Sequence, residues 1–170
     1  MSTTSAKLYS FNLSNSKTYL FSGLFIIGNL LLPQLAHLVP QGGLIFLPIY
    51  FFTLFAAYKY GIYVGLLTAI LSPLLNSLLF GMPDMTILPS IIVKSVILAV
   101  AASMTAKHLG KVSFVGILFA ILAYQLIGTA IEWAITQNFF IAIQDFRIGL
   151  PGMLIQLIGG FLLLKTLEKA

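Results

Sequence analysis

The chain has 170 residues, of which 59% are hydrophobic and only 8% are charged, and its mean hydropathy is +1.05. Soluble domains carry roughly 25% charged residues, so this composition predicts an integral membrane protein. At this length we expect one domain, without room for an additional nucleotide-hydrolysing module. The net charge of +5 comes from residues placed between apolar stretches, so we expect no nucleic-acid partner.

Residues 1–17 are rich in Ser, Thr and Asn, and we expect a polar N-terminal tail followed by a single membrane domain, 18–170. A membrane-spanning helix needs about 17 to 25 residues, most of them apolar. Six apolar segments follow in chain order at about 19–39, 44–57, 62–80, 87–106, 113–135 and 150–167. The sequence therefore predicts an all-α bundle of six transmembrane helices.

Proline and glycine mark the irregular points of this pattern. The second segment is short for a span and carries Pro48, which predicts a tilt, a kink or a start inside the preceding loop. The third segment contains Ser72-Pro73, where a missing backbone N–H favours a kink. Loops are expected at 40–43 and 81–85, where Gly and Pro cluster.

The positions of lysine and arginine predict the orientation, because short basic loops stay in the cytoplasm. One side of the predicted bundle collects Lys7, Lys17, Lys59, Lys107, Lys111, Lys165 and Lys169. The other side has Arg147 together with Asp84 and Asp145. We therefore expect both termini in the cytoplasm and the loops after the first, third and fifth segments on the outside.

Lys94 lies inside the fourth segment, where a charged side chain costs about 2.5 to 3.5 kcal/mol on insertion scales. Compensation is expected from Glu132 near the end of the fifth segment, from a bound anionic group, or from water in an open cavity. Two interpretations stay open. One is a structural ion pair or a side chain that snorkels to the surface, and the other is a ligand-binding site.

Trp133 and His37 also have two interpretations each. A tryptophan at the end of a span is commonly an interfacial anchor, but its ring can also stack on a planar ligand whose polar edge Glu132 binds. Gln34 and His37 lie three residues apart and share one helix face. A lone histidine at a membrane boundary is more often a local hydrogen-bonding group than a ligand.

Uncharged polar residues in the outer halves of the spans either bridge helices or line a shared pocket. The predicted pocket residues are Gln34, His37, Asn76, Met82, Asp84, Lys94, Gln125, Glu132, Trp133 and Gln156. No cluster of histidine, cysteine or carboxylate residues completes a metal site. No nucleophile motif or phosphate-binding loop indicates an enzyme, so we expect neither catalysis nor a cofactor.

A series of short motifs follows in order along residues 30–103. It comprises LLLP at 30–33 with His37, GLIFLPIY at 43–50, YGIYVGLL at 60–67, LSPLL at 71–75 and FGMP at 80–83. In order and spacing this series resembles the substrate-binding S components of energy-coupling factor (ECF) vitamin transporters. The remainder of the chain agrees in its hydrophobic layout of six helices.

The resemblance implies a protein of the prokaryotic cell membrane that binds a vitamin or related micronutrient in a pocket open to the outside. It also implies three partners, a transmembrane coupling subunit and two cytoplasmic ATPases, which drive release of the ligand inside the cell. The family's first helix often has an Ala-x-x-x-Ala face for docking the coupling subunit, and here the nearest match is Thr18 and Ser22 with Gly23. Its fourth helix tends to carry a glutamate where this chain has Lys94, which predicts a shift of ligand preference toward a carboxylate-bearing compound.

Two other classes of function stay open at this point. A small oligomeric channel or secondary carrier would use Lys94 and Glu132 to line a permeation path. A ligand-free structural subunit would use the same charges only to pair with each other.

Overall fold

The computed structural model describes residues 8–167, which form helices and turns with no strand. Five helical segments are long and apolar enough to cross a membrane: α1 (Ser16–Ala36), the composite segment Gly42–Tyr60, α4 (Ile62–Phe80), α5 (Leu88–Leu109) and α6 (Phe114–Thr136). A sixth apolar helix, α9 (Leu150–Thr166), is 17 residues long. The prediction of an all-helical chain with several helices of membrane-spanning length is confirmed.

The composite segment is broken at Leu47. It consists of α2 (Gly42–Phe46), the short 3-10 helix η1 (Pro48–Tyr50) and α3 (Phe51–Tyr60). Leu47 separates α2 from η1 with a left-handed backbone, φ +46°. The sequence marked the irregularity correctly through Pro48, which opens η1, because proline fits the first position of a helical turn.

Some helix boundaries differ from the predicted ones, because a capping residue determines where the helix begins or ends. The first helix begins at Ser16 rather than at residue 19, because the side chain of Asn15 accepts a hydrogen bond from the backbone N–H of Lys17. The fourth predicted span continues to Leu109 and ends at Gly110, whose φ of +62° suits a glycine. The predicted connection between the fifth and sixth segments contains two short helices, α7 (Phe139–Ala142) and α8 (Gln144–Arg147).

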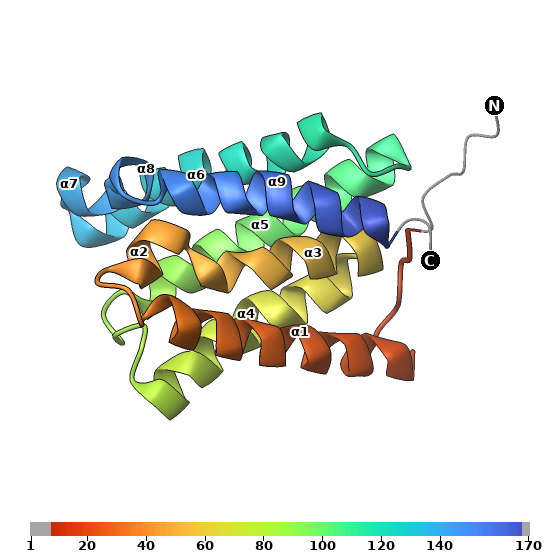
Figure 1. Cartoon of the computed structure of the whole chain (residues 1–170), viewed down its shortest axis with the longest axis horizontal. Coiled ribbons are helices and arrows are strands. Elements are labelled where there is room, and N and C mark those ends of the chain that lie inside the picture. The colour runs from red at the N-terminus through yellow and green to blue at the C-terminus, as the bar shows by residue number, and fades with distance from the viewer. Residues whose placement is uncertain (1–7, 168–170) are drawn as a thin grey trace.

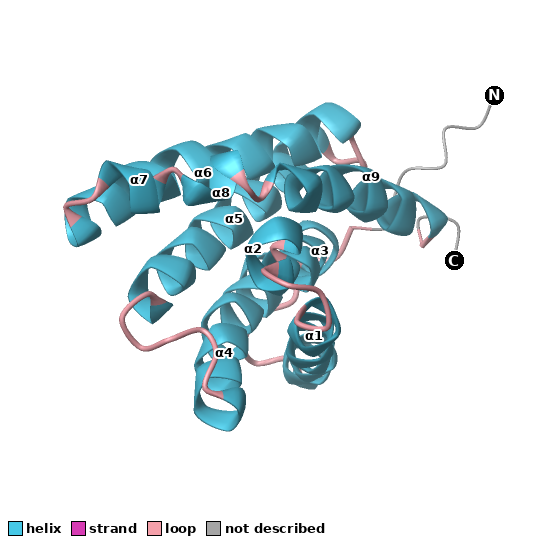
Figure 2. Ribbon diagram, turned by 60° about the vertical axis from the view of Figure 1, so that its left-hand side comes forward, coloured by secondary structure: helices cyan, strands magenta, loops and turns pink. Residues whose placement is uncertain are grey.

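The helices run roughly along one axis and leave two distinct ends (Figure 1). The connections 37–41, 81–87 and 137–149 gather at one end, named here the loop end. The N-terminal segment 8–15, the turns at 61 and 110–113 and the end of α9 gather at the other, named the terminal end. α3 occupies the middle and packs against α1, α4, α5 and α9, while α6 packs against α5 and α9 (Figure 2).

The bundle has a surface more apolar than parts of its interior. Outward-facing side chains of α1 form an exposed apolar stripe of Leu20, Leu24, Ile27, Leu31 and Leu35. The opposite face of the same helix buries Thr18, Ser22 and Asn29. An apolar exterior over a partly polar interior is the distribution expected when lipid, not water, surrounds the helices.

The N-terminal segment is not a free tail over its described part. The backbone N–H of Tyr9 donates to the carbonyl of Lys59 at 2.8 Å, and that of Phe11 donates to Tyr60. The Tyr9, Phe11 and Phe21 rings gather around the ring of Tyr60. Residues 8–15 therefore cover the terminal end, whereas residues 1–7 of the predicted tail lie outside the described residues.

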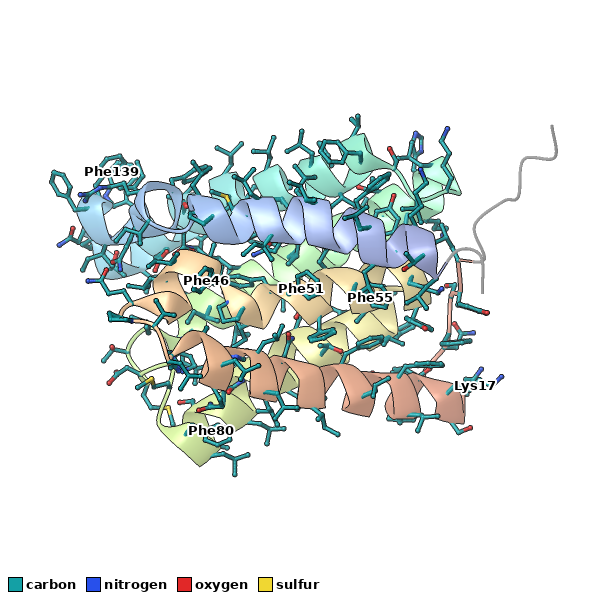
Figure 3. The ribbon with its side chains drawn as sticks, in the orientation of Figure 1. Lys17, Phe46, Phe51, Phe55, Phe80 and Phe139 are labelled. Carbon is teal, nitrogen blue, oxygen red and sulfur yellow. The ribbon has the colours of Figure 1, made fainter. Side chains whose placement is uncertain are left out.

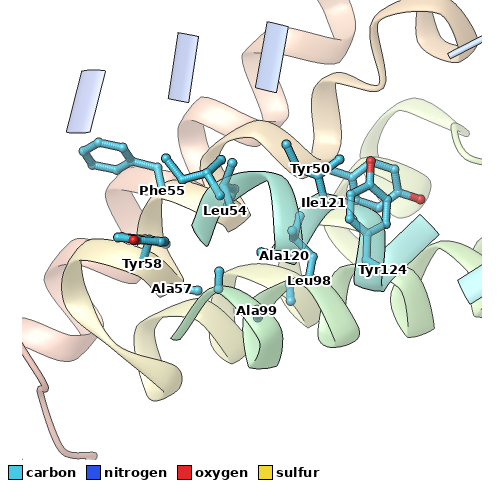
Figure 4. Packing of buried hydrophobic residues seen from close by; sticks show 14 of the residues in the cluster. Tyr50, Leu54, Phe55, Ala57, Tyr58, Leu98, Ala99, Ala120, Ile121 and Tyr124 are labelled. Carbon is cyan, nitrogen blue, oxygen red and sulfur yellow. The ribbon is translucent and has the colours of Figure 1, made fainter. Parts of the chain in front are cut away.

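Small side chains let the central helices approach closely. Ala57 on α3, Ala99 on α5 and Ala120 on α6 are all fully buried, and they lie among Leu54, Leu98 and Tyr58 (Figure 4). Gly65 on α4 packs directly against Ala57, where a Cβ built on the glycine would lie 2.5 Å from the Ala57 Cβ and 2.8 Å from its Cα. Backbone atoms cannot move aside as a flexible side chain can.

We therefore expect Gly65→Ala to lower the free energy of unfolding by about 1 to 3 kcal/mol, as overpacked cores usually do. Gly23→Ala on α1 is the matched control, because a Cβ there meets nothing within 4 Å. That variant should be neutral or more stable, since alanine is the better helix former by about 1 kcal/mol. Thermal unfolding of the two proteins in one detergent measures the difference, and equal melting temperatures would contradict the proposed close contact.

Candidate functional site

A buried ion cluster lies near the loop end between α5, α6 and α8. The ammonium nitrogen of Lys94 is 2.5 Å from a carboxylate oxygen of Glu132 and 2.7 Å from one of Asp145. Lys94 is only 2% exposed, and both carboxylates are largely buried. The structure thus provides the first of the predicted forms of compensation, the ion pair with Glu132, and adds a second acidic partner.

Local sequence explains how the lysine reaches both carboxylates. Gly128 on α6 faces the Lys94 side chain, and a Cβ at that position would lie 2.5 Å from the Lys94 Cγ. The absence of a side chain at 128 leaves space for the aliphatic part of the lysine. Glu132 lies four residues further along α6 and so shares this helix face.

A hydrogen-bonded network adjoins the ion cluster. The Tyr124 hydroxyl donates to Gln156 Oε1 at 3.1 Å, and Gln156 Nε2 donates to the carbonyl of Leu47 at 3.4 Å. Gln125 Nε2 donates to the sulfur of Met153 at 3.1 Å. These contacts join α6, α9 and the break before η1, which is the bridging role that the sequence allowed for Gln125 and Gln156.

A cavity of about 330 Å³ opens at the loop end beside this network. Residues of α1, α2, η1, α4, α5 and their connections line it: Pro33, His37, Gln41, Gly43, Leu44, Pro48, Ile49, Asn76, Met82, Pro83, Asp84, Ile87 and Ile91. Most of these side chains are apolar, and small-molecule sites typically combine apolar walls with a few polar groups. Four of the predicted pocket residues, His37, Asn76, Met82 and Asp84, line this cavity.

Asn76 is the buried polar group of the cavity. Its side-chain nitrogen donates to the carbonyl of Asn29 at 2.8 Å and to that of Ser72 at 3.1 Å. Because both carbonyls can only accept, the amide orientation is fixed. The Asn76 Oδ1 is buried and has no hydrogen-bond partner. An unpaired buried acceptor is unfavourable, and a donor placed in the cavity would relieve it.

Asp84 lies in the exposed connection between α4 and α5, at the mouth of the cavity. The backbone N–H of Thr86 donates to Asp84 Oδ1 at 2.9 Å, and the Thr86 hydroxyl donates to the same oxygen at 2.8 Å. These hydrogen bonds favour the charged form and lower the pKa of Asp84 below its usual value. Asp84 therefore remains ionised at neutral pH.

The η1 turn separates the ion cluster from the cavity. Ile49 lines the cavity, whereas the next residue, Tyr50, packs its ring 5.0 Å from the ring of Tyr124 in the polar network (Figure 4). Two consecutive residues of this turn thus contact different parts of the protein, Ile49 the cavity and Tyr50 the polar network. The ten predicted pocket residues do not form a single site, because four line the cavity and four belong to the ion cluster and its network.

The remaining predicted residues lie outside both compartments. Trp133 is 51% exposed, and its ring packs edge-on against Phe139 at the surface of the loop end, where Figure 3 labels Phe139. Gln34 is half-buried on α1 and is not among the residues that line the cavity. An exposed aromatic pair at one end of an apolar bundle is the arrangement expected of an interfacial anchor.

The predicted docking residues on α1 have different environments. Thr18 and Ser22 are buried and donate to the carbonyls of Asn12 and Thr18, respectively. The space next to Gly23 is open. Of the three residues, Gly23 is the one with open space where a second subunit could approach.

Sequence reasoning missed two residues that organise the site. Asp145 lies in α8, inside a segment predicted to be a loop, and its acidic character in an outer loop was the only available signal. Asn29 is fully buried at the centre of contacts between α1, α3 and α4. The signal for it was an amide side chain in the middle of the apolar first span.

Within residues 8–167, no three histidine or acidic side chains are grouped so as to hold a metal ion. No protein-family model, curated protein or solved structure matches this chain. The function is therefore inferred from the arrangement of its residues.

Proposed function

We propose that the chain is a membrane-embedded subunit that captures a small micronutrient, such as a vitamin or its precursor, in the cavity at the loop end. The supporting observation is the cavity itself, about 330 Å³ in volume, with the unpaired Oδ1 of the buried Asn76 among apolar walls. This volume lies at the lower end of the range typical for small-molecule sites, about 300 to 1,000 Å³. A ring-shaped compound of modest size fits such a space.

The proposed orientation has six helices crossing the membrane of a prokaryotic cell, with the terminal end in the cytoplasm and the loop end outside. Its support is the distribution of charge. Lys17, Lys59, Lys107, Lys111 and Lys165 belong to the terminal end, and Figure 3 labels Lys17 there. Basic residues near the ends of spans favour the cytoplasmic side. With 17 residues, α9 meets the lower limit for a span.

The proposed assembly is an importer of the energy-coupling factor type, in which a transmembrane coupling subunit and two ATPases drive release of the ligand inside. The ordered motifs between residues 30 and 103 support this family. Co-purification of the tagged chain with ATPase subunits from its own membrane would support the assembly. Uptake of the ligand into liposomes that contain the chain alone would instead favour the channel or carrier alternative.

Ligand binding is tested by thermal-shift and calorimetric screening of the purified chain against vitamins and their precursors. A ligand at 100 times its Kd stabilises a protein by about 2.7 kcal/mol, which in a domain of this size raises Tm by roughly 5 to 10 °C. We expect at least one compound to produce such a shift without ATP. A folded protein that shows no shift with the complete panel would contradict the proposal.

A pair of variants then locates the binding site. Ile87→Trp places a large side chain at the cavity wall and should abolish the shift produced by the active compound. Ile135→Trp makes the same change at an exposed position of α6 that is not among the cavity residues, and it should keep the shift. Equal binding by both variants would show that the compound binds elsewhere.

A further inference from the structure

The polar residues that line the cavity are His37, Gln41, Asn76 and Asp84. Of these, Asn76 offers a buried acceptor and Asp84 offers a carboxylate, and both restrict the chemistry of the ligand. At the buried part of the cavity, the unpaired Oδ1 of Asn76 can only accept a hydrogen bond. At its mouth, Asp84 carries a negative charge. Both Thr86 donors bind Asp84 Oδ1, so the second oxygen of this carboxylate is not used by Thr86.

Lysine and arginine, the side chains that most often bind a ligand anion, are not present in this lining. His37 is exposed at the rim of the cavity. A ligand carboxylate or phosphate would therefore lie near Asp84 without a lysine or arginine to bind it, and the two negative charges would repel each other.

The nearby cations do not change this conclusion. Lys94 is already held between the carboxylates of Glu132 and Asp145. Arg147 is exposed on α8 and is not a cavity residue. The sequence-based expectation of a carboxylate-bearing ligand depended on a free Lys94, and this pairing removes its basis.

We infer that the cavity selects an uncharged or cationic ring compound that donates hydrogen bonds, such as an aromatic amine or amide, and discriminates against its carboxylate or phosphate analogue. This inference rests on the proposed function. The apolar walls formed by Pro33, Leu44, Pro48 and Ile91 contact the ring. An N–H of the ligand donates to Asn76 Oδ1, and a cationic group, where the ligand has one, lies next to Asp84.

Matched ligand pairs that differ only in the charged group test this inference. The purified full-length chain is titrated at pH 8 with nicotinamide and nicotinate, with pyridoxamine and 4-pyridoxate, and with the aminomethyl and carboxy forms of 7-deazaguanine. In at least one pair, we expect the amine or amide to bind at least tenfold more tightly than the acid. Tighter binding of the acids, or equal binding within every pair that binds, would overturn the inference while leaving the micronutrient-binding function intact.

Two variants identify the groups that make the selection. Asp84→Asn keeps an oxygen for the Thr86 donors but removes the charge, so it should weaken a cationic ligand about tenfold and leave a neutral amide unchanged. Asn76→Leu should weaken either ligand at least tenfold, with Asn12→Leu at the terminal end as its control. Because Asp84 is exposed, its variant stays informative even where Asn76→Leu fails to fold. Unchanged affinity of a cationic ligand for Asp84→Asn would overturn its assigned role, and absence of binding by every compound would reject the proposed function together with this inference.

Discussion

Lys94→Met should lower the free energy of unfolding by about 3 to 5 kcal/mol, the usual cost of removing one partner from a buried ion pair. The variant keeps a side chain of similar length but leaves the carboxylates of Glu132 and Asp145 close together without a cation. Their mutual repulsion and their loss of hydration both favour the unfolded state. Denaturation of the purified protein in a single detergent measures the change.

Neutralising the whole cluster should restore most of this loss. In the triple variant Lys94→Met, Glu132→Gln, Asp145→Asn no unpaired charge remains, and buried ion clusters are often replaced by neutral side chains at little cost. Lys107→Met, an exposed lysine at the terminal end, is the control and should be nearly neutral. If Lys94→Met is as stable as Lys107→Met, the ion cluster does not stabilise the fold.

Asn29→Leu should lower the free energy of unfolding by about 2 kcal/mol, given that hydrogen bonds between membrane helices contribute roughly 0.6 to 1.7 kcal/mol each. The Asn29 side-chain nitrogen donates to the hydroxyls of Thr53 and Ser72 at 3.1 and 3.3 Å. Its oxygen accepts from the backbone N–H of Phe52 at 3.2 Å. Phe52 lies in the first turn of α3, where backbone N–H groups have no partner within the helix. The Asn29 side-chain oxygen therefore accepts from an N–H group for which the surrounding apolar side chains offer no acceptor.

The control for Asn29 is Asn12→Leu, which removes an exposed amide and should change stability by less than about 0.5 kcal/mol. Thermal and chemical unfolding of both variants test the difference. Because α1 and α4 also line the cavity, Asn29→Leu should weaken ligand binding as well. A variant with normal stability would show that Thr53, Ser72 and Phe52 find other partners.

The sequence predicted the apolar helices well because their signal is local. The span at 62–80 was predicted at the same residues as α4, since a long apolar run between two glycines needs no tertiary information. Boundaries set by caps were less accurate, as at Ser16 and Leu109. The helix α8 was missed because four residues carry too little periodicity to distinguish a short helix from a loop.

The sequence also identified Lys94 as a charge that needs compensation and Glu132 as one candidate partner, but it did not identify Asp145 as another. The free-energy cost of placing a charged side chain in a membrane depends on the residue and its position in an apolar segment, so it can be predicted from the sequence. Asp145 lies in the connection between α6 and α9, and the course of this connection brings it next to Lys94. No local sequence pattern predicts that course. Because Lys94 is paired with both carboxylates, the free lysine on which the expected carboxylate-bearing ligand depended is absent.

Length and hydropathy by themselves determined that this chain forms apolar helices suited to a membrane, because those properties belong to each segment separately. Only the tertiary structure decided that Asn76 and Asp84 share a cavity while Lys94 and Glu132 lie beyond the η1 turn in an ion cluster. The physical reason is that the rotation and packing of each helix fix which side chains meet. In an apolar environment, the few polar groups then settle with whichever partners that packing brings within hydrogen-bonding distance.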